Sequence, residues 1–232
     1  MAYEAKIHEA QTSILRELLF QPEAGYAELQ KPTGLSSDHF NFHIARLVEI
    51  GYVEKIRRGK YSLTPRGKEY ANKLDTDANV IERQPKSGVI LAIKKDDKFL
   101  FQERLKHPYY GFWGFPSGKI RWGETIIETA ARELKEETGL EADHEWKGIY
   151  HEQVFQAETG EQLEDKIFHI VLCTNVRGEL IEQFEGGRNA WLSLAQVGKQ
   201  AKKFESYKFE ADIARGKQIF IERIVEYSKQ EF

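Results

Sequence analysis

Apolar side chains in the first third of the chain recur at helical spacing. Ile14, Leu15 and Leu18 fall on one face when the segment is wound at 3.6 residues per turn. Pro32 ends a second short segment, because the residue before a proline avoids helical geometry. Two β-type runs then flank Gly59, which is typical of a hairpin. We therefore expect helices near 7–20, 25–31, 36–50 and from Thr64-Pro65 onward, with a hairpin over 52–63.

The third of these helices has recognisable ends. Ser36 or Ser37 can cap its first turn, because a hydroxyl oxygen accepts a hydrogen bond from a free backbone N–H. Gly51 suits the left-handed position that follows a helix. The inner face should carry the apolar positions Phe40, Ile44, Leu47 and Val48.

The pattern changes to alternating strands and helices in the second half. Val89–Ile93 is a continuous apolar run, typical of a buried strand, and Lys98–Arg104 is a second strand. Ile149–Phe155 and Lys166–Val176 suit a hairpin or neighbouring strands. The remaining elements expected are a strand at Trp191-Leu192, a helix from Ser193 and one or two helices over 203–229. This order predicts an α+β protein whose second part is a sandwich of helices on a mixed sheet.

A polar stretch over 74–88, with Pro85 and Gly88, separates the two patterns. The expected organisation is a first domain over 1–76, a linker over 77–87, a second domain over 88–202 and C-terminal helices over 203–232.

Composition narrows the class of protein. The chain has 232 residues, of which 41% are hydrophobic and 31% charged, as in soluble globular proteins. The net charge of −3 means that any nucleic-acid surface must be local. Cys173 is the only cysteine and lies in an apolar run, which indicates a small buried side chain and a reducing compartment. With no signal-like start and no membrane-length apolar stretch, we expect a cytoplasmic protein without a membrane partner.

A helix rich in carboxylates stands out after residue 124. Thr125 followed three residues later by Glu128 is a capping box, and Gly139 suits the end of the helix. Glu128 and Arg132 are spaced as an i,i+4 pair. The expected inner face comprises Ile127, Ala130, Ala131 and Leu134, which leaves Glu133, Glu136 and Glu137 on another face.

Three carboxylates this close repel one another unless a cation neutralises them or a pKa rises. Hard oxygen ligands favour Mg²⁺ or Mn²⁺ over zinc, and such a cation can bridge phosphate oxygens and activate water. For Glu136-Glu137 alone, a solvated helix face would be the better interpretation.

The spacing around these residues is more specific. Gly118 is followed after five residues by Glu124, and seven further residues lead to Arg132-Glu133-Leu134. Glu136-Glu137 and Gly139-Leu140 complete the pattern. This segment resembles the Nudix box at every fixed position, within a resemblance that covers about residues 85–200. The resemblance implies that Glu133, Glu136 and Glu137, with the Gly118 carbonyl, hold the metal while water attacks a nucleoside-linked diphosphate.

The resemblance leaves the catalytic base open. Glu133 is one candidate. Glu185 is another, because its Glu-Gly ahead of Trp191 resembles the MutT branch, although an ordinary loop charge is as good an interpretation. Arg132 is placed with the catalytic residues of the box and would orient its charges.

Substrate contacts can also be named. Arg104 ends a strand where similar arginines of the family contact phosphate, and Lys119 directly follows the box glycine. Phe112 is a candidate for stacking on a base. Each of these side chains could instead be an ordinary surface or packing residue. Trp113 and Phe115 are expected to pack the sheet. The substrate remains open beyond a nucleoside-diphosphate-linked small molecule.

The first domain contains Phe42-His43-Ile44-Ala45-Arg46-Leu47, then Gly51-Tyr52-Val53 and Leu63-Thr64-Pro65-Arg66-Gly67. With three helices, a hairpin and a further helix, this stretch resembles the winged helix-turn-helix of MarR- and ArsR-type regulators, and the resemblance covers about residues 5–75. Six positive side chains and no acidic one lie between Lys55 and Lys68, although residues 1–76 hold 11 Lys and Arg against 10 Asp and Glu. The resemblance implies contact with double-stranded DNA, from the third helix and from the hairpin. The candidates are Ser37, His39, Asn41 and His43 on the helix and Arg57, Arg58 and Lys60 on the hairpin. His43 could equally be a packing residue, and the domain could serve protein contact or homodimer formation instead.

Two functions follow. The first is a Nudix pyrophosphohydrolase with an appended, DNA-binding domain. The second is a transcriptional regulator whose Nudix domain senses a nucleotide metabolite. The intact carboxylate set favours the enzyme.

Overall fold

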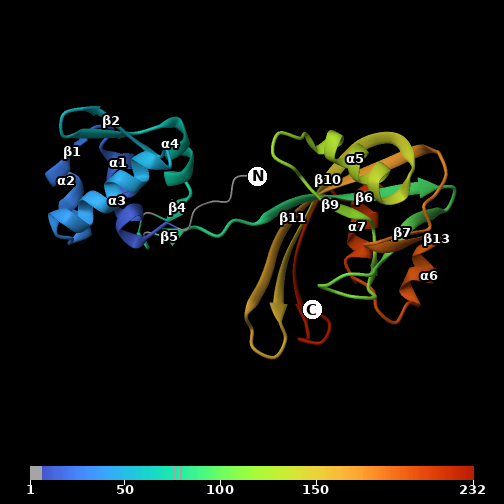
Figure 1. Ribbon diagram of the computed structural model, residues 1–232. Helices are drawn as coiled ribbons and strands as arrows, with labels where there is room; N and C mark the ends of the chain where they lie inside the picture. The colour runs from blue at the N-terminus through green and yellow to red at the C-terminus, as the bar shows by residue number, and fades with distance from the viewer. Residues whose placement is uncertain (1–6, 76, 79) are drawn as a thin grey trace. The chain divides into compact units, whose positions relative to one another are not determined.

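The computed structural model describes residues 7–75, 77–78 and 80–232 (Figure 1). The chain folds as two compact units, Met1–Arg83 and Gln84–Phe232. The boundary between them falls inside the predicted linker, and the first six residues of the expected first domain lie outside the described part. No described helix is long and apolar enough to cross a bilayer.

The first unit contains the expected helices and hairpin. The expected third helix begins after Ser36 and stops before Gly51, which has a φ of 74°. The side chain of Ser36 does not make the predicted capping hydrogen bond. Its buried side chains are Phe40, Ile44 and Leu47, whereas Val48, predicted to face inward, is 40% exposed. The elements are α1 (Glu9–Phe20), β1 (Ala24–Gly25), α2 (Tyr26–Gln30), a 3₁₀ turn (Lys31–Thr33), α3 (Ser37–Glu49), β2 (Val53–Arg57), β3 (Lys60–Leu63) and α4 (Pro65–Ala71).

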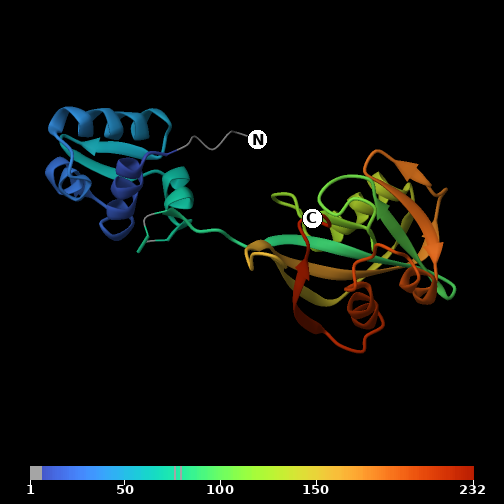
Figure 2. The same ribbon diagram turned by 90° about the horizontal axis from the view of Figure 1, so that it is seen from below.

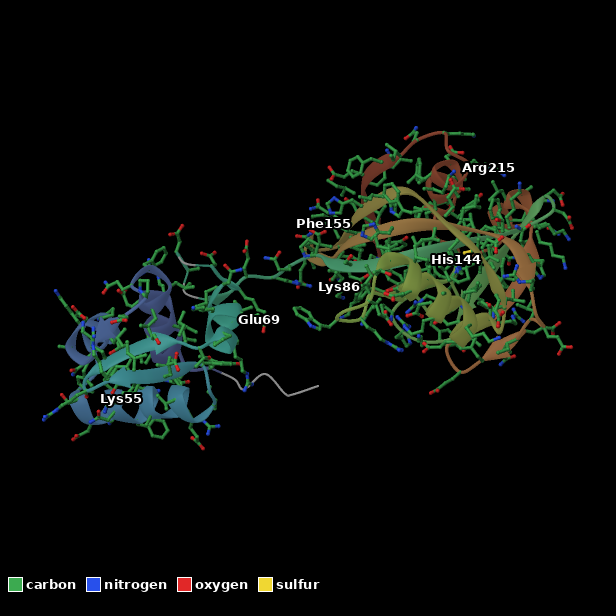
Figure 3. All side chains as sticks on the ribbon, turned by 90° about the horizontal axis from the view of Figure 1, so that it is seen from above. Lys55, Glu69, Lys86, His144, Phe155 and Arg215 are labelled. Atoms are coloured by element: carbon green, nitrogen blue, oxygen red, sulfur yellow. The ribbon has the colours of Figure 1, made fainter. Side chains whose placement is uncertain are left out.

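The first three strands of the first unit form a sheet in the order β1-β3-β2, with antiparallel neighbours. Thr64 caps α4 by accepting a hydrogen bond from the backbone N–H of Gly67. A side chain at Gly67 would collide with the backbone of Tyr52, so the glycine allows α4 to pack closely on the start of the hairpin. Lys55 on β2 and Glu69 on α4 are exposed (Figure 3).

The predicted linker over 77–87 is shorter than expected. Its residues Val80–Ile81 form β5, which pairs with β4 (Leu74–Asp75), and β6 already begins at Lys86. Polar composition alone therefore overstated the unstructured length, because the short pairing uses apolar residues, Leu74, Val80 and Ile81, within the polar stretch.

The second unit is built on a mixed sheet whose path is β12-β13-β7-β6-β11-β10-β14, with β8 paired to β7 and β9 to β6. Its strands are β6 (Lys86–Lys95), β7 (Lys98–Arg104), β8 (Trp113–Gly114), β9 (Ser117–Lys119), β10 (Glu141–Gln156), β11 (Gln162–Arg177), β12 (Gln183–Phe184), β13 (Gly187–Leu192) and β14 (Phe220–Tyr227). Its helices are α5 (Ile126–Thr138), α6 (Leu194–Gly198) and α7 (Tyr207–Ala214).

Helices cover both faces of this sheet (Figure 2). Along β6, Val89 and Leu91 pack into the core under α5, whereas Ile90 and Ala92 pack into the core under α6 and α7. This alternation explains why β6 reads as a continuous apolar run. Cys173 is fully buried in the α5 core, as predicted, and burial raises the pKa of its thiol to about 12. The mixed α+β architecture is confirmed.

The C-terminal segment corrects a prediction. Helices were expected over 203–229, but after α7 the chain forms β14, which runs parallel to β10 at the edge of the sheet. Ile221 and Val225 are half-buried while Phe220 and Ile224 are exposed. Apolar residues at both spacings in this segment fit a helix stripe as well as a strand, and pairing with β10 decided the outcome.

Candidate active site

The helix α5 carries the carboxylates and is fixed at both ends. Thr125 accepts a hydrogen bond from the backbone of Glu128, whose carboxylate in turn accepts one from the backbone of Thr125. Gly139 ends the helix with a φ of 72°. These caps confirm the predicted ends. They also occupy Glu128, so the predicted ion pair of Glu128 with Arg132 does not form.

The inner face of α5 differs in part from the prediction. Ala130 and Leu134 are buried as expected, but Ile127 is 41% exposed and Ala131 is also exposed. Thr129 and Thr138 are fully buried in their place. Threonine side chains can be buried here because their hydroxyls hydrogen-bond nearby groups, and apolarity alone did not identify them.

Gly118 and Glu133 approach each other closely. A side chain at Gly118 would collide with the Glu133 carboxylate, so only glycine fits at this position of β9. β9 pairs with β6, where Val89 lies opposite Gly118. The glycine of the motif therefore lets a helix carboxylate reach the sheet.

Arg132 links the carboxylates of this segment. Its guanidinium contacts Glu124 Oε1 at 2.6 Å, Glu133 Oε1 at 2.6 Å and Glu136 Oε2 at 3.2 Å. It also donates to the Lys119 carbonyl at 3.2 Å. The hydrogen bonds from Arg132 lower the pKa of Glu124 to about 2. Arg132 thus orients the charges of the helix, as predicted, but through Glu124 rather than Glu128.

Glu137 is held from the other side by amide groups. Gln102 Nε2 donates to Glu137 Oε2 at 3.0 Å, and Asn189 Nδ2 donates to the Glu137 carbonyl at 2.9 Å. Gln102 also donates to Asn189 Oδ1 at 3.3 Å, so the two amides orient each other. Burial raises the pKa of Glu137 despite the bond from Gln102. Neither amide was predicted from the sequence, since both lie on strands that are far from the helix along the chain.

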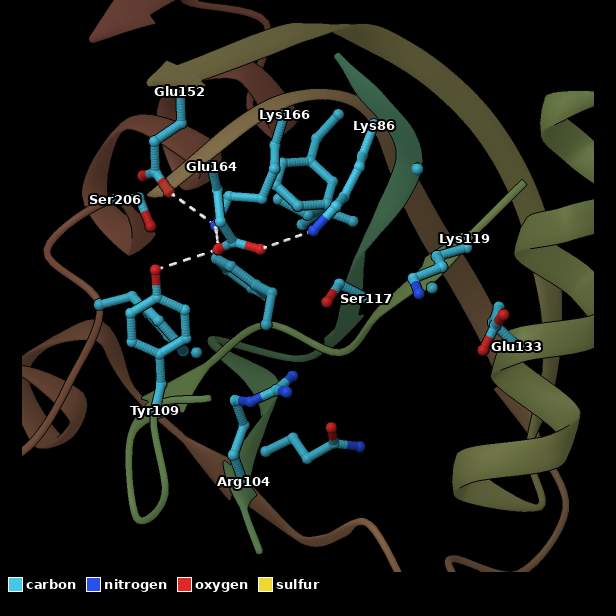
Figure 4. Close-up of a pocket in the computed structure, with 18 of the residues that line it drawn as sticks. Lys86, Arg104, Tyr109, Ser117, Lys119, Glu133, Glu152, Glu164, Lys166 and Ser206 are labelled. Carbon is cyan, nitrogen blue, oxygen red and sulfur yellow. Dashed lines mark hydrogen bonds and ion pairs between the residues drawn. The ribbon is translucent and has the colours of Figure 1, made fainter. Parts of the chain in front are cut away.

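A cavity of about 630 Å³ opens beside these groups. Lys119 and Glu133 line one end (Figure 4), and Gly118, which touches Glu133, lines the cavity with Arg121 and Glu137. Arg104 and Ser117 lie between the two ends (Figure 4). The other end is lined by Tyr109, Glu152, Glu164, Lys166, Ser206 and Glu210, which we call the polar chamber.

The structure places two predicted substrate contacts at the cavity. Arg104 lines it and donates from Nε to the Pro108 carbonyl at 2.9 Å, and burial lowers the pKa of its guanidinium. Lys119 lines it as an exposed side chain. Glu136 is not among the cavity-lining residues. Its side chain is 49% exposed and contacts Arg121 and Arg132.

Two other predicted residues lie elsewhere. Phe112 is 3% exposed and packs against Tyr109 and Phe204, so this structure does not offer it for stacking on a base. Trp113 and Phe115 pack the sheet core, as predicted. Glu185 is exposed in the turn between β12 and β13 and is absent from the cavity-lining residues.

The polar chamber was not predicted. Its signal lay in the alternation along β10, where Glu152 occupies an inward position between buried Tyr150 and Val154. A carboxylate in such a position is unusual, because an ionised side chain is rarely buried without a partner.

The metal candidates can be tested against the donor chemistry. Glu133, Glu136 and Glu137 offer the oxygen donors that a hard divalent cation prefers, and the close approach at Gly118 brings the backbone of β9 to the same place. Among the described residues, no three His, Cys, Asp or Glu side chains already stand close enough together to hold a metal ion. The donor types fit, and in this structure Arg132 contacts Glu133 and Glu136 while Gln102 contacts Glu137.

The predicted DNA contacts of the first unit divide in two. Ser37, His39 and Asn41 are exposed on α3. His43 is half-buried and packs against the tilted ring of His8 at 4.6 Å between ring centroids, and its Nδ1 has no hydrogen-bond partner among the described residues. On the hairpin, Arg57 pairs with Glu23 at 2.8 Å and Lys60 with Glu28 at 3.2 Å, while Arg58 is exposed.

Comparison with known proteins identifies the family. Residues 82–213 match the NUDIX domain, which is more than half of the chain. The chain belongs to the NUDIX family. An ADP-ribose pyrophosphatase of Methanocaldococcus jannaschii is 36% identical over 84 residues, which are 34% of this NUDIX chain and 50% of the relative. The human 8-oxo-dGDP phosphatase NUDT18 is 39% identical over 59 residues, which are 25% of this chain and 18% of the relative.

The chain therefore spans half the length of the first curated relative and less than a fifth of the second. A solved structure of a MutT protein from Bacillus halodurans covers 63% of this chain and 93% of its own, with 22% identity and a TM-score of 0.51. That likeness supports the NUDIX fold of the second unit.

Proposed function

We propose that the protein is a pyrophosphohydrolase that cleaves the diphosphate of a nucleoside-diphosphate-linked substrate by attack of water. The observation that carries this proposal is the cavity, which has box carboxylates Glu133 and Glu137 at one end and room for a further group at the other. Family membership supports the same chemistry.

Glu133, Glu136 and Glu137 would hold a divalent cation, Mg²⁺ or Mn²⁺, together with Gly118. Such a cation supplies charge neutralisation on the diphosphate and lowers the pKa of bound water. Arg132 orients Glu133 and Glu136 by donating hydrogen bonds to both.

Cationic side chains at this end of the cavity and in its middle would bind the diphosphate. Lys119, Arg121 and Arg104 line the cavity, and guanidinium and ammonium groups match phosphate oxygens in charge and in hydrogen bonding. The base that accepts the proton from water is Glu133 or Glu185. Glu133 has the better position, since it lines the cavity and Glu185 does not.

The substrate class we propose is a nucleoside diphosphate that carries a second group, as in ADP-ribose. An ADP-ribose pyrophosphatase among the relatives favours this class. The length of the cavity beyond Arg104 favours it too, because a single nucleotide phosphate would leave the polar chamber without a ligand.

The test is a substrate panel assayed with Mg²⁺ and with Mn²⁺. It should include ADP-ribose, other nucleoside diphosphate sugars, dinucleoside polyphosphates, and nucleoside di- and triphosphates. We expect release of a nucleoside monophosphate from at least one compound with two groups on the diphosphate. Absence of turnover across the whole panel with either metal would refute the proposal.

For the first unit we propose a winged helix-turn-helix that binds double-stranded DNA. The sheet order β1-β3-β2, the exposed polar residues of α3 and the exposed Arg58 at the tip of the hairpin favour this function. The pairing of Arg57 with Glu23 and of Lys60 with Glu28 reduces the charge available for phosphate. If the unit binds DNA, the alternative of a regulator that senses a nucleotide through its NUDIX domain becomes a second role for the same site.

A further inference from the structure

The polar chamber is a cluster of ion pairs contributed by separate parts of the fold. Lys166 on β11 lies 3.1 Å from Glu152 Oε1 and 3.0 Å from Glu164 Oε2. Tyr109, from the loop after β7, donates to Glu164 Oε2 at 3.0 Å. Glu210 on α7 lines the same end of the cavity and contacts the side chain of Ser206.

Stability alone is a poor explanation for this arrangement. Glu152 is 3% exposed and Glu210 is 5% exposed, so their burial carries a desolvation cost. Packed apolar residues of similar volume often stabilise a fold as well as a buried ion pair does. The charged groups also line an open cavity instead of being sealed within the core.

The charged side chains of the chamber neutralise one another. Glu152 and Glu164 pair with Lys166 and with Lys86, which lies 3.2 Å from Glu164, and the pKa of the buried Glu210 is raised. The chamber therefore offers a diphosphate no unpaired cation. The side chains proposed to bind the diphosphate lie outside the chamber, and Figure 4 shows Lys119 and Glu133 well apart from Glu152 and Ser206. A ligand that fills the cavity must therefore place an uncharged polar group in the chamber.

The donors and acceptors of the chamber are mixed. Burial raises the pKa of Glu210 to about 8, so near neutral pH this carboxyl is mostly protonated and can donate a hydrogen bond. Burial works to raise the pKa of Glu164 as well, but Lys166 and its other partners outweigh this effect and lower it, so Glu164 is an acceptor. Ser206 can do both.

Hydroxyl groups suit such a mixture because each of them donates and accepts. Phe168 and Phe204 line the cavity as well and offer apolar surface for the C–H groups of a ring. We propose that the polar chamber, through Glu152, Lys166 and Ser206, binds the hydroxyls of a sugar attached to the far phosphate. This inference rests on the proposed function and names the substrate as a nucleoside diphosphate sugar.

The decisive experiment compares two substrates that differ only in hydroxyls. ADP-ribose places a hydroxylated sugar on the second phosphate, whereas the β-methyl ester of ADP keeps the same diphosphate linkage without hydroxyls. The test variants are Ser206→Ala and the double variant Glu152→Gln/Lys166→Met. The double variant removes both members of the ion pair together, which avoids leaving one buried charge without its partner.

We expect the double variant to lower kcat/KM for ADP-ribose about tenfold or more, mainly through KM, and for the methyl ester less than about twofold. Ser206→Ala should give a smaller effect in the same direction. The matched control is Glu145→Gln/Lys147→Met, which removes a pair at 3.0 Å on β10 outside the cavity and should change neither substrate. Melting temperatures show whether each variant is folded.

Equal losses for both substrates would overturn the proposal, because the chamber would then support the site without contacting the sugar. A loss that follows the base, seen when ADP-ribose is replaced by its inosine counterpart, would place the nucleobase in the chamber and also overturn it. Calorimetric binding of the non-hydrolysable α,β-methylene analogue of ADP-ribose provides the readout if no hydrolysis occurs. Weaker binding by the double variant supports the sugar site even if the proposed enzymatic function fails, and unchanged binding refutes it.

Discussion

At the scale of single residues, the box carboxylates point in different directions from α5. Glu133 and Glu137 are one helical turn apart and line the cavity, whereas Glu136 points toward Arg121 and solvent. The sequence predicted all of them and their helix, because spacing and capping are local properties. It could not predict Gln102 and Asn189, since their role depends on strands brought to α5 by tertiary packing.

The exposed position of Glu136 makes its role testable. We predict that Glu136→Gln lowers kcat by at least about 100-fold while leaving the melting temperature within a few degrees, because a metal-binding carboxylate loses its charge and a largely exposed side chain packs little. Steady-state kinetics over a Mg²⁺ titration, together with thermal unfolding, would measure both.

Glu128→Gln is the matched control on the same helix. Glutamine preserves a capping box, so activity and stability should stay close to those of the native protein. Unchanged turnover in Glu136→Gln would remove this residue from the metal site.

At the scale of elements, β14 shows where the sequence was insufficient. Its apolar residues fitted a helix, and only the pairing partner β10, about 70 residues earlier, gives them a strand geometry. The edge is secured by His151 of β10, whose Nδ1 lies 2.7 Å from Glu222 Oε2 on β14 and whose Nε2 lies 2.8 Å from Asp165 Oδ1 on β11. One ring thus joins three strands.

This contact predicts a pH-dependent stability. Burial alone would lower the pKa of His151, but its bonds to the two carboxylates raise it above the usual 6.5. A group whose pKa is raised in the folded state stabilises fully below its unfolded pKa and loses that contribution as pH rises through the folded value. The stability difference between the native protein and His151→Gln should therefore be larger at pH 6 than at pH 9.

Urea unfolding at several pH values would measure this difference. His107→Gln serves as a control, because His107 is exposed in the loop after β7 and has neither carboxylate as a neighbour. A difference that stays constant with pH would show that the imidazolium contributes nothing to holding β14.

At the scale of the whole molecule, two units with distinct cores were predictable, because a polar stretch separates two hydrophobic patterns. The boundary fell within the expected linker, but the β4–β5 pairing was missed because such short strands have no periodicity to detect. The proposed DNA binding of the first unit depends on its surface charge. The number of positive residues in the sequence did not show that some of them, such as Arg57 and Lys60, form ion pairs with glutamates.

The hairpin provides a test of duplex binding by the full chain. We predict that Arg58→Ala weakens binding to double-stranded DNA and reduces the salt slope by about one, since one phosphate contact is lost. Arg57→Ala should have a smaller effect, because that side chain is engaged by Glu23. Fluorescence anisotropy over a salt series would measure both.

Lys98→Ala, an exposed lysine of the second unit, is the control and should leave the slope unchanged. If the native protein fails to bind duplex even at low salt, the first unit has another partner.

The strand β6 contributes both to the hydrophobic core and to the wall of the cavity. Ile90 belongs to the core under α6 and α7, and it also lines the cavity beside Ser87 and Gly88. Because side chains alternate along a strand, the same register that buries Val89 and Leu91 under α5 presents Ile90 to the ligand. A substitution that reshapes the cavity at this strand must therefore be accommodated by a close-packed interior, so new specificity is more readily acquired at the chamber and loops than here.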